Sequence, residues 1–224
     1  MNERGGSQRI PRPATARQGA PPPWAHLASD ARRFTLDTVR AVLAKPRPSR
    51  PIDVGPNARP AAVLVALFEV DGDTHVILTK RPETMPSHQG EIAFPGGKHD
   101  PAIDATLADT ALREAHEEVD LDPATVEIVA QLEPIGTVAS QFVITPFVGF
   151  LTERPMLVPH EREVESVFDV SLAELLADET HRSEIWPTRD LELNIHFYEL
   201  TGETVWGATA RILTNLLVLL TAGR

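Results

Sequence analysis

The segment Arg113–Glu118 reads Arg-Glu-Ala-His-Glu-Glu and gathers three carboxylates within six residues. On a helix, Glu114, Glu117 and Glu118 would be neighbours, because residues three or four positions apart share a face. Each exposed pair of like charges at this spacing costs about 0.2–0.5 kcal/mol, and more beside an apolar surface. Either Arg113, four residues before Glu117, or a divalent cation such as Mg²⁺ or Mn²⁺ can offset this repulsion. The alternative is that this acidic run is simply the solvent-exposed face of a helix.

A glycine turn precedes this acidic segment. In Phe94-Pro95-Gly96-Gly97-Lys98, a rigid proline is followed by a glycine pair that lets the backbone turn tightly and approach a ligand or metal ion. The glycine spacing is not that of a P-loop, and His99 stands where Ser or Thr would follow the lysine. An ordinary turn before a helix would have the same residues. Because the chain has no cysteine, any metal must be held by oxygen or imidazole.

Hydrophobic periodicity predicts the elements that position these residues. A helix is expected over 104–119, with Asp104 as a plausible N-cap and Asp120-Leu-Asp-Pro as its end. Two strands are expected at 61–70 and 74–81, joined by a hairpin turn at Asp71-Gly72-Asp73. Further strands are expected over 126–132, 142–151 and 193–200, and further helices over 171–177 and 207–220. This pattern is typical of a compact α/β domain.

Charge divides the chain of 224 residues and net charge −11 into two regions. Residues 1–60 hold 11 of the 21 basic residues, 4 of the 32 acidic residues and 10 of the 20 prolines, so their charge is +7 and that of the remainder is −18. Residues 1–23 have little apolar surface and are expected to be mobile, although a basic arm that contacts nucleic acid or a protein is an alternative. A short helix is expected over 34–44 and an extended linker over 45–60.

Several classes of protein are excluded or disfavoured by composition. No apolar run approaches the roughly 18 residues of a spanning helix, and the first residues lack the apolar core of a signal peptide. We therefore expect a soluble cytoplasmic protein with no membrane partner. The acidic balance makes nucleic acid an unlikely partner for the main domain. A homodimer is compatible with the sequence, which does not fix the oligomeric state.

Together, the glycine turn and the acidic segment resemble the box of the Nudix hydrolase family, G-x5-E-x7-R-E-U-x-E-E-x-G-U, where U is aliphatic. Gly97 matches the first glycine, residues 113–118 match the R-E-U-x-E-E core, and Leu121 matches the last aliphatic position. The loop between Gly97 and Arg113 is two residues longer than in the family pattern.

The sequence departs from that box at two positions. No Glu occupies its early acidic position, although Asp100 and Asp104 lie nearby, and Asp120 replaces its late glycine. Aspartate tolerates the left-handed conformation that glycine adopts at a helix end, so we expect little change in structure there.

A second resemblance concerns the loop before the box. Residues 77–81, Gly90 and 94–97 resemble the extra motif of coenzyme A pyrophosphatases, L-L-T-x-R-[SA]-x3-R-x3-G-x3-F-P-G-G. Pro82 replaces the small residue of that motif, and Pro86 replaces its second arginine. Segments 146–149, 163–170 and 203–210 are also similar to that subfamily. The resemblance covers about residues 61–220 and leaves the basic N-terminal region out.

The family resemblance implies an α/β Nudix fold over 61–224, an α/β/α sandwich with a mixed sheet. It implies hydrolysis of a diphosphate linkage with Mg²⁺ or Mn²⁺ as cofactor. The implied metal ligands are Glu114, Glu118 and the Gly97 carbonyl, with Glu117 as a further ligand or the general base. Arg113 would orient a neighbouring carboxylate. Glu163, in the loop 159–165, is either a rival base or an exposed acidic residue.

Substrate phosphates need cations, which the acidic main domain offers in small number. Lys80, Arg81 and Lys98 lie within or beside the motif and are expected to approach phosphate, unless they serve as solvated surface groups. His88 either donates to phosphate or stabilises its own loop. The leading substrate is coenzyme A or an acyl derivative, cleaved to 3′,5′-ADP and 4′-phosphopantetheine. Another nucleoside diphosphate derivative, such as ADP-ribose or a dinucleotide, is the enzymatic alternative, and a catalytically silent nucleotide-binding domain is the non-enzymatic one.

Overall fold

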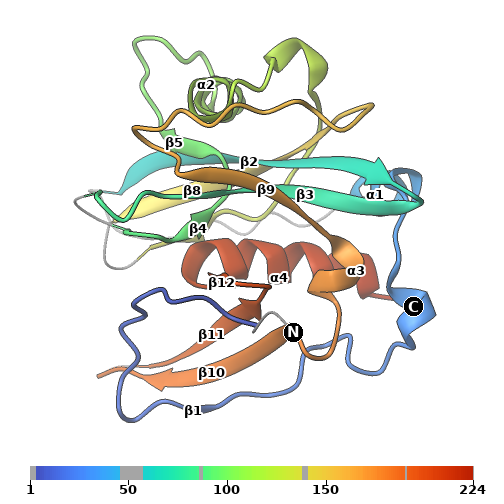
Figure 1. Cartoon of the computed structure of the whole chain (residues 1–224), viewed down its shortest axis with the longest axis vertical. Helices are drawn as coiled ribbons and strands as arrows, with labels where there is room; N and C mark the ends of the chain where they lie inside the picture. Colours follow the sequence, from blue (N-terminus) through green and yellow to red (C-terminus); the bar gives the residue numbers. More distant parts are fainter. Residues whose placement is uncertain (1–3, 46–57, 86–87, 138–140, 190, 224) are drawn as a thin grey trace.

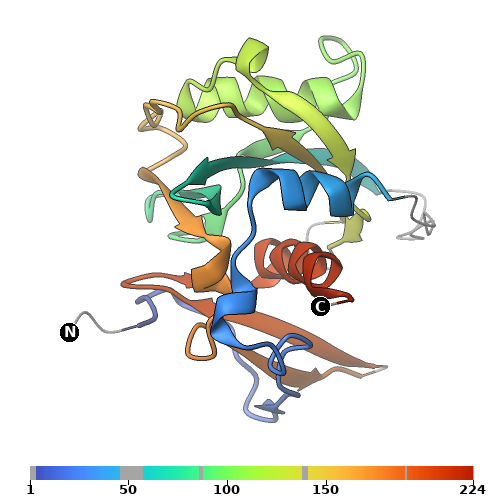
Figure 2. The ribbon, with the colours of Figure 1, turned by 90° about the vertical axis from the view of Figure 1, so that its right-hand side faces the viewer.

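The computed structural model describes residues 4–45, 58–85, 88–137, 141–189 and 191–223. The chain is arranged in layers around a large mixed sheet (Figure 1, Figure 2). Helix α2 (Leu107–Val119) covers one face of this sheet, and α4 (Gly207–Thr221) and α1 (Leu36–Leu43) lie against the other. The predicted α/β/α sandwich with a mixed sheet is confirmed. A small second sheet, which the sequence does not predict, lies beyond α4.

The large sheet is built around β2 (Arg59–Val70). This strand pairs antiparallel with β3 (Asp73–Lys80) and parallel with β8 (Phe142–Phe150), which makes the sheet mixed. Shorter strands complete it: β4 (Ile92–Ala93), β5 (Gly96–Lys98), β6 (Glu127–Gln131), β7 (Ile135–Gly136) and β9 (Ser166–Ser171). Strand β9 is not among the strands expected from the sequence, and it pairs antiparallel with β3, a long-range pairing that local patterning does not reveal.

Side chains of β2 and β3 alternate between two apolar cores. Leu64 and Phe68 of β2 and Ile77 of β3 pack in the core under α2, whereas Leu67, Val76 and Leu78 belong to the core that contains α4. The strands predicted over 61–70 and 74–81 are thereby confirmed as buried on both faces. Their turn places Asp71 at φ 50° and Gly72 at φ 78°, the left-handed pair that a two-residue hairpin loop requires.

The small sheet has the order β1-β10-β11-β12. Its strands are β1 (Arg17–Gln18), β10 (His181–Pro187), β11 (Glu192–Glu199) and β12 (Thr204–Val205). The buried Tyr198 of β11 shares a hydrogen bond of 2.8 Å with Thr214 of α4, which ties this sheet to the rest of the molecule. The remaining helices are short: α3 (Leu172–Leu175), η1 (Ser29–Arg32) and η2 (Pro123–Thr125).

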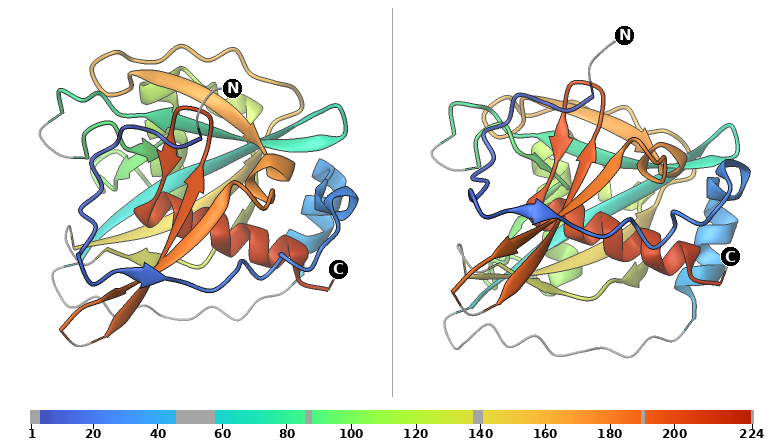
Figure 3. Two further views of the ribbon diagram at one scale, coloured as in Figure 1. Left: turned by 60° about the horizontal axis from the view of Figure 1, so that its bottom comes forward. Right: turned by 90° about the horizontal axis from the view of Figure 1, so that it is seen from below.

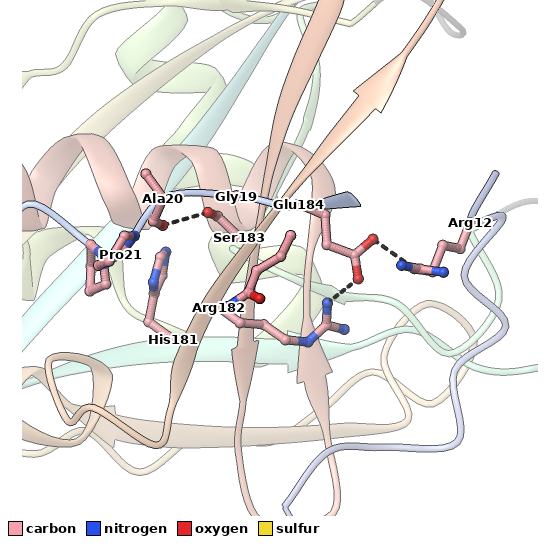
Figure 4. A pocket seen from close by; sticks show the side chains of 10 residues that line it. Arg12, Gly19, Ala20, Pro21, His181, Arg182, Ser183 and Glu184 are labelled. Carbon is pink, nitrogen blue, oxygen red and sulfur yellow. Dashed lines mark hydrogen bonds and ion pairs between the residues drawn. The ribbon is translucent and has the colours of Figure 1, made fainter. Parts of the chain in front are cut away.

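The segment predicted to be mobile, residues 1–23, makes defined contacts in the part that the structure describes. Residues 4–23 run along the small sheet, and β1 pairs with the edge of β10 (Figure 3). The segment also forms one wall of a pocket of about 380 Å³ (Figure 4), where Ser183 donates to the Ala20 carbonyl and Arg12 pairs with Glu184. The arginines therefore bind acidic groups of strands some 170 positions away in the sequence, which local composition cannot show.

The basic N-terminal region also contributes to the main core. Trp24, Phe34 and Val39 are fully buried in the core that contains α4. Helix α1 begins at Leu36, where the side chain of Thr35 caps it, inside the range predicted over 34–44. Most of the linker predicted over 45–60 lies outside the described residues. Within the described ranges, no helix has both the length and the hydropathy needed to cross a membrane.

Candidate active site

Helix α2 carries the acidic segment and has well-defined ends. Thr106 is its N-cap and forms a reciprocal capping box with Asp109. The prediction that Asp104 caps the helix is wrong, because Asp104 lies two residues earlier and is buried. At the other end, Asp120 adopts φ 57° and ψ 30°, so aspartate does take the left-handed conformation expected of the glycine it replaces.

Gly97 and Glu114 are in direct contact. A Cβ atom at Gly97 would lie 2.4 Å from the carboxyl carbon of Glu114, so only glycine leaves room for this side chain. Strand β5 places Gly97 there by pairing it with Ala62 of β2. Burial raises the pKa of Glu114, and the negative charges of Glu117 and Glu163 add to the rise, while the hydrogen bond from Arg113 opposes it.

Glu118 is the most deeply buried of the three box glutamates, with 5% of its surface exposed. Its carboxylate accepts a hydrogen bond of 3.1 Å from the backbone N–H of Gly96. Burial raises its pKa to about 8 despite that bond; Glu114 and Glu163 raise it further, and Arg81 lowers it. The pKa of Glu118 therefore depends on the charges of Glu114, Glu163 and Arg81.

Arg113 holds the acidic groups of α2 in fixed positions. Its guanidinium binds both oxygens of Asp104, at 2.8 Å and 2.9 Å, and lies 2.9 Å from Glu114 and from Glu117. Asp104 also accepts from the hydroxyl of Thr110, and its pKa is held well below the ordinary value, chiefly by Arg113. Asp104, one of the two acidic residues near the early acidic position of the box, is thus the buried partner of Arg113. In the sequence, the only indication of this role is that Asp104 is an acidic residue in the segment that leads into the helix.

Glu163 lies in a loop that is fastened to the end of α2. The backbone N–H of His160 donates to the Glu118 carbonyl, and the N–H groups of Glu163 and Val164 both donate to the His160 carbonyl. Val164 is buried in the core under α2. Glu163 itself is exposed, and its charge acts on Glu114 and Glu118.

The four residues predicted to contact phosphate lie in different surroundings. Arg81 is beside Glu118, and its Nε atom is buried with no hydrogen-bond partner among the described residues. Lys98 is exposed on β5 next to Gly97. Lys80 follows Val76 and Leu78 in the alternation of β3, faces the core side of α4, and pairs with Glu165 and Glu203, so the structure does not bring it to the site.

His88 does not reach the box either. It is exposed, has φ 57°, and its Nδ1 lies 2.8 Å from Glu91, three residues further on. This is the loop-stabilising arrangement that was the alternative to phosphate binding. Pro86, which replaces the second arginine of the coenzyme A motif, lies outside the described residues.

The donors at this site have the chemistry that a hard divalent cation requires. Glu114, Glu118 and the Gly97 backbone offer only oxygen, and the raised pKa of Glu118 reflects a buried carboxylate that lacks a full counter-charge. Among the described residues, no group of three acidic or imidazole side chains is arranged so that it could hold a metal ion, and Arg113 contacts both Glu114 and Glu117. The residues fit Mg²⁺ or Mn²⁺ by donor type and charge.

Substitution of Gly97 by alanine should abolish activity without unfolding the protein. The added methyl group would displace the Glu114 carboxylate, while the backbone of Gly97 has no positive φ that alanine would strain. Since a small misplacement of a reacting group can cost on the order of 100-fold in rate, we expect a fall of that size in kcat. Steady-state kinetics and thermal melting check this, and a variant with wild-type kcat would contradict it.

Comparisons with known proteins agree with this arrangement. A family model described as NUDIX domain matches residues 58–189, more than half of the chain. Nudix hydrolase 22, chloroplastic, of Arabidopsis thaliana is 44% identical over 162 residues, which cover 68% of this chain and 52% of that protein. A protein named uncharacterized Nudix hydrolase NudL, of Enterobacter sp. (strain 638), is 37% identical over 185 residues, or 82% of this chain and 93% of that one. The chain therefore belongs to the Nudix family.

Two further findings describe the extent of the likeness. The chain spans about half the length of the Arabidopsis relatives that it matches. Among solved structures, a MutT/nudix family protein from Enterococcus faecalis is 17% identical, with a TM-score of 0.49, over 78% of this chain and 71% of that chain.

Proposed function

We propose that this chain hydrolyses the diphosphate linkage of a nucleoside diphosphate derivative, with coenzyme A or an acyl-coenzyme A as substrate and Mg²⁺ or Mn²⁺ as cofactor. The products would be 3′,5′-ADP and a 4′-phosphopantetheine compound. One observation carries the proposal: two carboxylates with raised pKa values, Glu114 and Glu118, lie beside the glycine turn, near Arg81, whose Nε has no hydrogen-bond partner among the described residues.

The chemistry of the linkage explains why these groups belong together. A diphosphate repels both hydroxide and acidic side chains, and a divalent cation held by Glu114, Glu118 and the Gly97 carbonyl would neutralise phosphate charge and lower the pKa of water. Glu117 or Glu163 would accept a proton from the attacking water. Arg113 fixes the carboxylates, and the guanidinium of Arg81, whose Nε has no hydrogen-bond partner within the described ranges, would bind a phosphate oxygen.

A substrate panel tests the proposal directly. Coenzyme A, acetyl-coenzyme A, ADP-ribose, NADH and diadenosine polyphosphates would be incubated separately with the full chain and Mn²⁺, and the products identified by mass spectrometry. We expect cleavage of coenzyme A to 3′,5′-ADP. Rapid cleavage of ADP-ribose without cleavage of coenzyme A would overturn the substrate assignment. Binding of nucleotides without any cleavage would favour the non-enzymatic alternative.

The substitution Arg81→Lys should raise KM for the cleaved substrate about tenfold with a smaller change in kcat. Lysine keeps the charge but loses the Nε donor and the forked geometry that bind phosphate oxygens, a loss of about 1.4 kcal/mol in binding. The matched control is Arg40→Lys, because Arg40 pairs with the exposed Glu127 on the far side of the sheet from α2. Equal KM values for Arg81→Lys and the control would exclude phosphate binding by Arg81.

A further inference from the structure

Lys80 connects three segments that are distant in the sequence. Its Nζ atom lies 2.9 Å from Glu203, in the turn between β11 and β12, and 3.3 Å from Glu165, next to β9. The lysine side chain is 18% exposed, and its pKa is raised, chiefly by the hydrogen bond to Glu203. It therefore stays charged and is partly shielded from water, conditions under which an ion pair resists screening.

Glu165 ends the loop that carries Glu163. Besides the ion pair, its backbone N–H donates to the Lys80 carbonyl at 2.8 Å, so Lys80 holds this residue by main chain and side chain together. The opposite end of the loop is fixed to α2 through the bond from His160 to the Glu118 carbonyl. Glu163 lies between these two attachments, where its charge acts on Glu114 and Glu118.

The other partner of Lys80 is held by the N-terminal segment. The amide of Gln8 donates to Glu203 and accepts from the backbone N–H of Thr204, and the N–H of Gly6 donates to the Thr204 hydroxyl. Residues 6–8 thus fix the β11–β12 turn, which presents Glu203 to Lys80. The ordered chain of contacts runs from Gln8 through Glu203, Lys80 and Glu165 to the Glu163 loop.

We propose that Lys80 is a positioning residue that holds the Glu163 loop against α2, and that the N-terminal segment supports it through Glu203. Lys80 does not touch the substrate; it acts through Glu165 on the placement of Glu163. This inference rests on the proposed function, because it assigns the N-terminal segment a role in the same hydrolysis. It also replaces phosphate binding as the role of Lys80.

The test compares Lys80→Met, Lys80→Arg and Glu203→Gln in the full chain. We expect Lys80→Met to lower kcat about tenfold with KM unchanged, because a displaced loop costs rate and not phosphate affinity. Lys80→Arg should restore most of the rate, because a guanidinium can also bridge two carboxylates. Glu203→Gln should lower kcat in the same direction. The matched control is Lys45→Met, which removes an exposed lysine at the end of α1.

Hydrogen exchange provides a readout that does not depend on activity. In Lys80→Met, amides of residues 158–166 should exchange faster than in the wild type, while those in the middle of α2 remain unchanged. A raised KM with wild-type kcat, or unchanged exchange over 158–166, would overturn the inference. If the wild-type chain cleaves no nucleotide, the proposed function fails, whereas the exchange measurement still decides whether Lys80 holds the loop.

Discussion

Substitution of Glu118 by glutamine is expected to abolish hydrolysis and to stabilise the metal-free protein at alkaline pH. Loss of a proposed metal ligand should lower kcat by about 1,000-fold, since a bound metal ion can supply several kcal/mol of transition-state stabilisation. The folded protein meanwhile no longer has to bury an ionised carboxylate, and the glutamine carbonyl can still accept from the N–H of Gly96.

The pH dependence of this effect has a definite sign. The pKa of Glu118 is about 8 in the folded protein and has its ordinary, lower value of 4.5 in the unfolded chain. Its contribution to stability is therefore favourable below the unfolded value and is lost progressively as the pH rises through 8. Relative to Glu118→Gln, the wild type should be equally stable near pH 4 and less stable by on the order of 5 kcal/mol at pH 9.

Thermal melting in EDTA across this pH range measures the difference. A gain of about 10–20 °C in Tm is expected for Glu118→Gln at pH 9. The exposed Glu153, in the loop after β8, supplies the control substitution Glu153→Gln, which should change neither Tm nor kcat. A loss of stability in Glu118→Gln at pH 9 would mean that the buried carboxylate is stabilised by contacts other than the bond to Gly96.

Substitution of Asp104 by asparagine should destabilise the protein and impair catalysis together. Asp104 is 5% exposed and receives two hydrogen bonds from Arg113, so its removal leaves a guanidinium without its main partner. Breaking such a buried pair costs about 3 kcal/mol, which corresponds to a fall of about 6–12 °C in Tm. Because the pKa of Asp104 is depressed in the folded protein, this stabilisation is present above its unfolded pKa and is lost on acidification.

The catalytic effect of Asp104→Asn comes from Arg113. Without its two bonds to Asp104, Arg113 is held by Glu114 and Glu117 alone and competes more strongly with a cation for their oxygens. We expect the Mn²⁺ concentration needed for half-maximal activity to rise. Asp109→Asn is the control, because Asp109 is an exposed capping residue on the same helix. If Asp104→Asn melts like this control, the Asp104–Arg113 pair contributes little to the fold.

The sequence predicted those parts of the structure that depend on short-range patterns. Helix α2, the β2–β3 hairpin and the left-handed end at Asp120 follow from periodicity and from the conformational preferences of single residues. The grouping of Glu114, Glu117 and Glu118 on one helix follows from the same spacing. Gly97 could be placed beside them because its motif has a fixed position before the helix.

The remaining features depend on pairing between distant residues. Lys80 and Arg81 are adjacent in the sequence, and the alternation along β3 decides that the charge of Arg81 acts on Glu118 while Lys80 pairs with Glu203. Asp104 suited an N-cap by type, and its burial under Arg113 arises from the path of the longer loop. Arg12 and Arg17 pair with Glu184 and Glu192, which lie on strands of the small sheet far away in the sequence.

The short strand β1 has a consequence for how the chain behaves in solution. Arg17 and Gln18 occupy part of the outer edge of β10, and the N–H of Gly19 continues along it by donating to the Ser183 carbonyl. A chain shortened to the catalytic body would leave this edge with unpaired backbone groups, which are a template for strand addition by a second molecule. The N-terminal segment therefore also covers this sheet edge and opposes self-association. Its prolines favour this role because they lack the N–H group needed to extend a sheet further.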